Sequence, residues 1–288
     1  MNVLVLGATG MLGNTVFRVL AETNGIQVFG SVRQIEAQHF FTTELASQLV
    51  VVENLEKYDQ LERLLDAVQP QVVVNCISLE KSASQDLEKS LSIFSLLPQR
   101  LGHLCRLRDA RLIQISSDGV FSGSRGKYTE DDCPDASDVY GIAKLLGEVK
   151  EPHAITLRTS IIGHELQTKT GLLEWFLAQN NQCLCYRRTI FSGFPTVVLA
   201  RLIRDVVLPR PDLYGVYHVA SQPISKFDLL QMVAQKYAKA IELVPDDRIV
   251  IDRSLSAERF AKVTGYVPPA WPELIDSMYS YKYGLEKK

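Results

Sequence analysis

A glycine-rich turn directly after the first apolar run constrains the fold more than any other feature. Asn2–Leu6 is typical of a strand buried on both faces, and a turn reading GATGMLG follows at once. Gly7 permits a tight bend, Gly10 lets the backbone approach a pyrophosphate, and Gly13 lets the next helix pack closely on the strand. That helix N-terminus would offer amide groups and a positive dipole end to phosphates. With this GxxGxxG spacing, we predict dinucleotide contacts from Gly7, Thr9, Gly10, Met11 and Leu12.

Strand-like runs alternate with helical patterns through the first 160 residues. The strand-like runs lie at 27–32, 50–53, 72–76, 112–116 and 155–158, and the helical patterns at 13–22, 58–68, 91–107 and 140–149. Such alternation predicts an α/β fold with a parallel sheet and right-handed crossovers. Beyond residue 160 the rhythm changes. We therefore expect a first domain over 1–160, a second mainly over 161–288, and segments near 190–220 that return to the first.

The end of the second strand bears on which dinucleotide is bound. An NAD-binding chain usually places a carboxylate there, for the ribose 2′-hydroxyl. Here the strand ends in Gly-Ser-Val-Arg, with no acid until Glu36. Arg33, helped by the Ser31 hydroxyl, could bind a 2′-phosphate, so NADPH is predicted as the preferred cofactor and NAD as a second option. Arg33 as a solvated loop residue is the alternative. Asn54 could contact the adenine ring or could cap the helix that follows it.

A serine, a tyrosine and a lysine have the spacing of a proton-transfer site. Ser117 ends a predicted strand, and Tyr140 and Lys144 are four apart on a predicted helix, so they share a face. A phenol titrates near 10, and neighbouring cations lower that pKa toward neutrality. Ser117 could then hold a carbonyl oxygen while Tyr140 donates a proton and a nicotinamide donates hydride. We predict these three as the catalytic residues.

Bulk composition excludes several classes of partner. The 288 residues carry a net charge of −2 with a pI near 6.2. The chain therefore has no net positive charge that would attract nucleic acid or an anionic membrane surface. No apolar run approaches the roughly 20 residues of a membrane span, and a cleaved signal is not expected. The five cysteines are scattered without zinc-type spacing, which favours a reducing, cytoplasmic compartment and no metal. Cys183 and Cys185 are expected to face one side of a strand, as buried thiols in preference to metal ligands.

These motifs together resemble the extended short-chain dehydrogenase/reductases, and most closely the dTDP-4-dehydrorhamnose reductase-like branch. The resemblance covers nearly the whole chain and also rests on Val74–Cys76, Ile115–Phe121 with Gly123, Leu157–Ser160, Gly193–Thr196 and Gly215–Val219. It implies a Rossmann-type doubly wound parallel sheet with a smaller C-terminal substrate-binding domain. It carries the family's catalytic trio to the three residues above. Cys76 and Ile77 match a loop that passes over the cofactor, and Ser160 matches a position beside the nicotinamide.

The resemblance also implies an activity, the NADPH-dependent reduction of a keto group at carbon 4 of a nucleotide-linked deoxysugar. A homodimer is an expected assembly. The sequence departs from the family at residues 92–95, which lack the asparagine that supports the lysine through water. Ile190 and Phe191 also replace the Asp-Gln that usually precedes the G-x-P-T segment. The triplet Ser117-Asp118-Gly119 lacks the second acid of related dehydratases, which argues against dehydration.

Two other functions stay open on the sequence. An epimerase that keeps its cofactor bound would use the same trio, and a cofactor-binding regulatory subunit would need no turnover.

Basic residues are expected near the substrate, because nucleotide-sugars carry a diphosphate. The candidates are Arg187, Arg188 and Lys81, and the alternative for each is a solvated surface position. Trp175 could stack on a base, although core packing is the more common role for such a residue.

Overall fold

The structure is a computed structural model that describes residues 1–80 and 83–285. It divides the chain into two compact units that interleave along the sequence. Unit 1 contains residues 1–116, 138–157 and 200–216, and unit 2 contains residues 117–137, 158–199 and 217–288.

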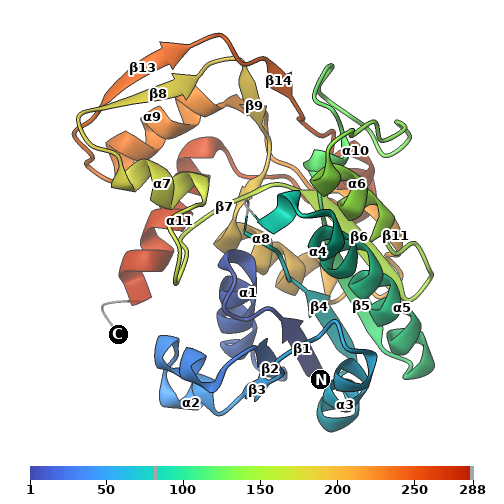
Figure 1. Cartoon of the computed structure of the whole chain (residues 1–288). Helices are drawn as coiled ribbons and strands as arrows, with labels where there is room; N and C mark the ends of the chain where they lie inside the picture. Colours follow the sequence, from blue (N-terminus) through green and yellow to red (C-terminus); the bar gives the residue numbers. More distant parts are fainter. Residues whose placement is uncertain (81–82, 286–288) are drawn as a thin grey trace. The chain divides into compact units, whose positions relative to one another are not determined.

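A seven-stranded sheet carries most of unit 1 (Figure 1). Its strands, in spatial order, are β3 (Leu49–Val51), β2 (Gln27–Val32), β1 (Asn2–Leu6), β4 (Val72–Asn75), β5 (Arg111–Ser117), β6 (Ala154–Thr159) and β11 (Gly215–His218). The β1 strand pairs in parallel with both β2 and β4, so the strand order reverses between β1 and β4. Ligands of doubly wound sheets bind at such a reversal, outside the carboxyl ends of the strands.

Helices cover the sheet because its strands are apolar on both faces. Leu4 and Leu6 pack into a core cluster with α3 (Tyr58–Val68) and α5 (Leu97–Leu107). Successive strand residues face opposite sides, so Val3 and Val5 face the other way, and α1 (Met11–Ala21) packs against β1 and β2. The predicted α/β class and the Rossmann-type doubly wound sheet are confirmed.

Residues 200–216 belong to unit 1, and an arginine of β5 binds two of their carbonyl groups. The guanidinium of Arg111, at the start of β5, donates to the carbonyls of Val207 at 2.7 Å and Leu213 at 3.0 Å. Burial lowers the pKa of this guanidinium, while Asp212 raises it. The remaining helical segments of unit 1 are η1 (Ile35–Phe40), α2 (Thr43–Ala46), η2 (Ala83–Gln85), α4 (Leu87–Ser90), η3 (Leu91–Leu96), α6 (Val139–Leu146) and η5 (Ile203–Val207).

The helix expected over 91–107 is not uniform. Residues Leu91–Leu96 form a π-helical segment, η3, and regular α-helix follows as α5. Pro98 explains the change, because it has no N–H to offer the carbonyl of Phe94 four residues back. The predicted range is therefore helical throughout, and its first 6 residues are π-helical.

Unit 2 contains three small sheets, with orders β12-β9-β14, β13-β8 and β10-β7. Their strands are β7 (Ile161–Ile162), β8 (Gln182–Tyr186), β9 (Thr189–Phe191), β10 (Phe194–Pro195), β12 (Ile224–Ser225), β13 (Glu242–Asp246) and β14 (Ile251–Asp252). Its helical segments are η4 (Asp118–Val120), α7 (Leu172–Ala178), α9 (Lys226–Lys236), α10 (Glu258–Thr264) and α11 (Trp271–Leu285). The helix α8 (Thr196–Leu202) begins in unit 2 and ends in unit 1. Among the described helices, none combines the length and apolar character needed to cross a membrane.

Candidate active site

The glycine turn of unit 1 lies where the strand order reverses. Gly7 has φ +78°, a conformation that glycine adopts without steric cost. A Cβ on Gly7 would lie 3.3 Å from the Cα of Ile77, and a Cβ on Gly13 would lie 2.0 Å from the carbonyl oxygen of Gly7. Gly13 is therefore required by a close backbone approach, whereas Gly7 is favoured mainly by its positive φ. The turn brings Gly7 against the Cys76–Ile77 segment that follows β4. Residues that follow β1 and residues that follow β4 therefore lie together at the carboxyl end of the sheet.

The N-terminus of α1 can receive phosphate oxygens. Its N-cap is Gly10, which has no side chain to accept from the first-turn amides, and the first turn has no acidic residue. The turn and the helix dipole therefore present donors and positive potential from the segment that contains Thr9, Met11 and Leu12. This chemistry fits the pyrophosphate of a dinucleotide.

The residues expected near the adenosine half have distinct environments. Arg33 is exposed, and it forms no hydrogen bond or ion pair with other described residues. The Ser31 hydroxyl instead lies buried and accepts from the Gly7 amide at 3.1 Å, so it supports the glycine turn. The Asn54 side-chain oxygen accepts from the Glu56 amide at 2.8 Å, which makes a local turn before α3.

Tyr140 and Lys144 lie on α6, whose N-cap Asp138 accepts from the Gly141 amide at 2.8 Å. The Tyr140 ring meets the Phe94 ring edge-on at 5.3 Å. Lys144 is only 7% exposed, and its Nζ donates to the carbonyl of Ile115 in β5 at 2.7 Å. The ammonium also lies 5.2 Å from the centre of the Phe94 ring. The lysine is thus held on the strand that ends at Ser117.

Burial lowers the pKa of Lys144 to about 8, although Glu148 and Cys76 act in the opposite direction. Burial raises the pKa of the Cys76 thiol to about 12, so this thiol is neutral. The unfolded chain therefore holds the lysine proton more tightly than the folded chain between about pH 8 and the ordinary value of 10.5. Below pH 8 the buried ammonium costs stability, and the cost diminishes as the pH rises through this window.

We expect Lys144→Met to raise the Tm at pH 7, because it removes that buried charge. The Tm difference from the wild type should diminish as the pH is raised from 8 to 10. Thermal unfolding at a series of pH values measures it, with the exposed Lys150→Met as control. A lower Tm for Lys144→Met at pH 7 would contradict the sign of this effect.

The segment that lacks the family asparagine still contacts α6. Ser95 is buried, and its hydroxyl donates to the carbonyl of Ala143 at 2.8 Å. The Ser92 hydroxyl instead bonds Glu56. At the end of α6, a Cβ on Gly147 would lie 1.7 Å from the carbonyl oxygen of Phe94. The π-helical segment and the Tyr-Lys helix therefore meet backbone against backbone.

In unit 2, Ser117 is surrounded by polar groups. It is 8% exposed, and its hydroxyl donates to the Asp118 carboxylate at 3.2 Å and accepts from the Gly119 amide at 2.9 Å. Burial raises the pKa of Asp118 to about 6, against the opposing effects of Arg253, Ser117, Lys226 and Ser160. Ser160 thus lies close to Asp118, and its carbonyl accepts from the Phe194 amide at 2.9 Å.

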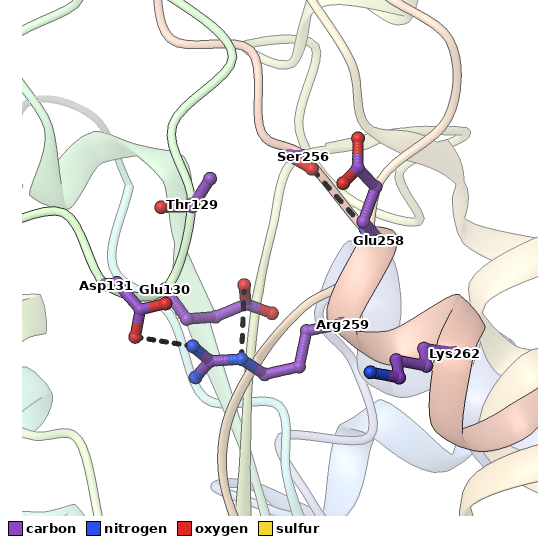
Figure 2. A pocket seen from close by; sticks show the side chains of 7 residues that line it. All are labelled: Thr129, Glu130, Asp131, Ser256, Glu258, Arg259 and Lys262. Carbon is purple, nitrogen blue, oxygen red and sulfur yellow. Dashed lines mark hydrogen bonds and ion pairs between the residues drawn. The ribbon is translucent and has the colours of Figure 1, made fainter.

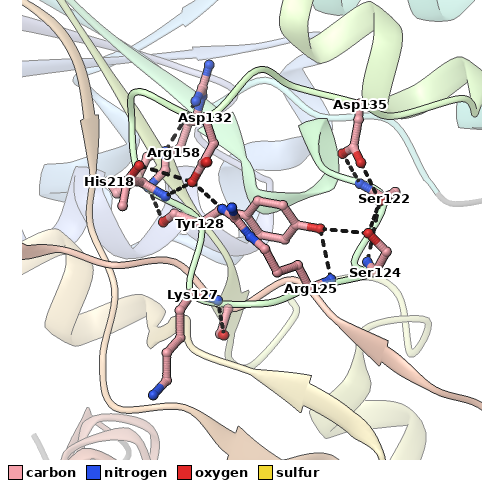
Figure 3. A network of polar contacts seen from close by, with 11 residues as sticks. Ser122, Ser124, Arg125, Lys127, Tyr128, Asp132, Asp135, Arg158 and His218 are labelled. Atoms are coloured by element: carbon pink, nitrogen blue, oxygen red, sulfur yellow. Dashed lines mark hydrogen bonds and ion pairs between the residues drawn. The ribbon is translucent and has the colours of Figure 1, made fainter.

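A polar and aromatic network fixes the loop after Ser117 (Figure 3). The Phe121 and Tyr128 rings stack at 4.2 Å, and Arg158 lies over the Phe121 ring at 5.3 Å. His218 bonds Arg158 through Nε2 at 3.2 Å and the carbonyl of Tyr128 through Nδ1 at 3.0 Å. Burial, with Arg158 next in effect, lowers the pKa of His218 to about 4, so the imidazole is neutral. These contacts therefore join the loop that follows Ser117 to Arg158 and His218.

The other sequence candidates lie in less specific surroundings. Arg187 is exposed and paired with Asp247, and Arg188 is exposed. Trp175 is 39% exposed, so it is not a core residue. Lys81 lies outside the described residues. Sequence reasoning did not single out Arg253, which has no motif to mark it.

A separate pocket of unit 2, of about 340 Å³, contains none of the predicted site residues (Figure 2). It is lined by Thr129, Glu130, Asp131, Ser256, Glu258, Arg259 and Lys262. Its Arg259 points toward the two carboxylates of Glu130 and Asp131, and pairs with the latter at 2.6 Å. Much of its charge is therefore internally balanced.

The two cysteines of β8 face one side, as predicted. Cys183 and Cys185 are buried, with 3.7 Å between their sulfur atoms. Burial raises the pKa of Cys185 to about 12. Within residues 1–80 and 83–285, no group of three or more metal-ligating side chains comes together.

Two solved structures share the fold of this chain. A dTDP-4-dehydrorhamnose reductase from Clostridium acetobutylicum matches with a TM-score of 0.81 and 18% identity, over 98% of this chain and 100% of that one. The Bacillus anthracis dTDP-4-dehydrorhamnose reductase, solved in complex with NADP, matches with a TM-score of 0.78 and 19% identity. The match covers 100% of this chain and 99% of that one. At these identities the likeness establishes the fold.

Curated relatives match at higher identity. Methionine adenosyltransferase 2 subunit beta from Rattus norvegicus is 30% identical over 260 residues, which cover 82% of this chain and 72% of that protein. A probable low-salt glycan biosynthesis reductase, Agl14, from Haloferax volcanii is 31% identical over 169 residues, or 56% of this chain and 54% of that protein. The family described as RmlD substrate binding domain matches residues 1–280, and this chain therefore belongs to it.

Proposed function

We propose that the protein reduces a keto group, at carbon 4, of a nucleotide-linked deoxysugar with NADPH as the hydride source. The single observation that carries the proposal is the buried Lys144 ammonium on the Tyr140 helix, bonded to the strand that ends at Ser117. The glycine turn supports a dinucleotide at the same end of the sheet. Domain 1–160 would hold the cofactor, and the part mainly over 161–288 would receive the sugar.

The chain's own residues would bind, orient and transfer a proton. The first-turn amides after Gly10 would hold the pyrophosphate, with Cys76, Ile77 and Ser160 nearer the nicotinamide. A nicotinamide cofactor, when bound, would supply the hydride that the carbonyl carbon accepts. Ser117 would donate to the carbonyl oxygen, and Tyr140 would transfer its phenolic proton to that oxygen, which yields the alcohol. The Lys144 ammonium favours the phenolate that remains, because a nearby positive charge lowers the pKa of a phenol.

The cofactor preference depends on Arg33, which is exposed and uncommitted among the described residues. We expect Arg33→Ala to weaken NADPH binding by roughly tenfold or more and NADH binding little, because a charge-assisted contact to the 2′-phosphate would be lost. Calorimetry with both cofactors measures the difference. Arg63→Ala is the control, since that exposed arginine pairs with Asp59. Equal weakening of both cofactors would remove the 2′-phosphate role.

The activity is tested by NADPH absorbance decay with a panel of 4-keto-6-deoxy sugar nucleotides, alongside calorimetric cofactor binding. Decay with one member of the panel supports the reductase and identifies its substrate. Tight cofactor binding without decay on any member contradicts it. In that case an epimerase with a retained cofactor is tested by inversion of a sugar nucleotide at constant NADPH.

A second candidate function is a non-catalytic subunit. The observation that favours it is the 30% identity to methionine adenosyltransferase 2 subunit beta over most of both chains. Residues 92–95 also lack the asparagine that supports the lysine through water in the family, and a subunit without turnover would not need that proton relay. Co-purification with a methionine adenosyltransferase catalytic chain, together with no NADPH oxidation, would favour this role over the reductase.

A further inference from the structure

Two buried amide side chains lie opposite each other at the carboxyl end of the central sheet. Asn75 is the last residue of β4, and its register partner in β5 is Gln114. Each is 3% exposed, whereas Val73 and Leu112, two residues earlier in the same strands, belong to the apolar core cluster. Because residues two apart in a strand share a face, the amide pair continues an otherwise apolar face of the sheet.

The hydrogen bonds of this pair fix both amides in one orientation. The Asn75 Oδ1 accepts from the Ile77 amide at 3.2 Å, so the Asn75 Nδ2 is the donor to the Gln114 Oε1, at 2.8 Å. The Gln114 Nε2 then donates to the carbonyl of Ile115 at 3.1 Å. A backbone N–H can only donate, so the direction of every bond in the series follows from the Ile77 amide.

The same carbonyl of Ile115 accepts from the ammonium of Lys144, at 2.7 Å. A carbonyl oxygen has two lone pairs, which match the two donors, the Gln114 amide and this ammonium. An unbroken series of hydrogen bonds thus joins the Ile77 amide to the Lys144 ammonium. Ile77 itself lies against the glycine turn, since its Cα is 3.3 Å from the position of a Cβ on Gly7.

Stability alone does not account for a buried amide pair at this place. Buried polar groups give up their bonds to water, and apolar side chains of similar shape in both positions can be neutral or stabilising. Valine and leucine occupy the places two residues earlier in the two strands. The amides provide what apolar side chains do not, a defined direction for the Ile77 amide and for the Ile115 carbonyl.

We propose that Gln114 is a positioning residue, which holds the Cys76–Ile77 loop and the Lys144 ammonium in one fixed arrangement. Its role rests on the proposed function, in which that loop lies near the nicotinamide and the ammonium favours the phenolate of Tyr140. Gln114 acts through the two hydrogen bonds of its buried side chain. A loosened arrangement would impair cofactor binding and proton transfer together.

The test uses Gln114→Met and the double variant Asn75→Leu/Gln114→Met, each in the full chain. Methionine is close to glutamine in length and makes neither hydrogen bond. The single change leaves the buried Asn75 amide unpaired, so it should lower the Tm. The double variant removes that amide as well, and water can reach the half-buried Ile77. The Tm of the double variant should therefore lie within about 5 °C of the wild type.

Both ends of the series should respond in both variants. The Ile77 amide should exchange with deuterium roughly tenfold faster, by NMR, because it loses a fixed acceptor. The ε-¹³C signal of Lys144, assigned by its absence in Lys144→Met, should change position. Calorimetric NADP⁺ affinity should fall by roughly threefold to tenfold, and turnover at saturating NADPH by roughly tenfold. The matched control is Gln71→Met, directly before β4 at the opposite end of that strand, and it should match the wild type throughout.

A response at one end alone, or at neither, would overturn the inference, because the loop and the ammonium would then be held separately. A lower Tm in Gln114→Met with wild-type turnover in the double variant would assign the pair to stability and would also overturn it. Failure of the proposed function is distinct. If no protein reduces a sugar, the wild type included, while Ile77, Lys144 and NADP⁺ affinity all respond, the positioning role is kept and the reductase is rejected.

Discussion

Tyr140→Phe is expected to lower turnover of a keto sugar nucleotide by at least about two orders of magnitude, with NADPH binding retained. The reason is that this substitution removes one oxygen and little else. The ring packs edge-on against Phe94 at 5.3 Å, and phenylalanine keeps that contact. The proposed proton donor is lost, while the glycine turn and Arg33 are untouched. Single-turnover NADPH oxidation measures the loss of turnover, and calorimetry measures the retained NADPH binding.

The matched control is Tyr214→Phe, which removes a phenol from an exposed tyrosine of the same unit. We expect wild-type turnover in that variant. Near-wild-type turnover in Tyr140→Phe would remove Tyr140 from the mechanism. Loss of NADPH binding in Tyr140→Phe would instead assign the hydroxyl to cofactor binding.

Local sequence patterns predict the part of this protein that depends on near neighbours in the chain. The run Asn2–Leu6, the turn beginning at Gly7 and the alternation that follows led to the correct parallel sheet. Each strand, turn and helix in this pattern depends on residues that are close together in the chain, so period and turn chemistry are enough to recognise it. The π-helical segment was missed because Pro98 lies inside an otherwise regular helical pattern, and its effect falls four residues earlier.

The site divides in the same way. The positions of Tyr140 and Lys144 on one helix follow from their spacing. The burial of Lys144 against Ile115 does not, because it depends on how that helix packs on the sheet. The pairing of Ser225 and Asp252 with Ile190 could not be predicted from the sequence for a related reason. It is made by strands of only two residues, β12 and β14, whose partner no local pattern identifies.

The contact between the Tyr-Lys helix and the π-helical segment leads to the second large effect. We expect Gly147→Ala to lower the Tm by roughly 5–10 °C, because its Cβ would lie 1.7 Å from the backbone oxygen of Phe94. Backbone atoms cannot move aside as a flexible side chain can, so the end of α6 must shift. Since α6 carries Tyr140 and Lys144, turnover should fall in the molecules that remain folded.

Gly102→Ala separates this backbone clash from a general intolerance of larger residues in the same unit. Its Cβ would meet only the side chain of Val149, at 3.0 Å, which can adjust. Gly102 also lies inside α5, where alanine is favoured over glycine by up to about 1 kcal/mol, so the Tm should change little or rise. Thermal unfolding and NADPH oxidation of both variants decide the matter. If Gly147→Ala were as stable as Gly102→Ala, the close approach to Phe94 would not position α6, and the burial of Lys144 would need another cause.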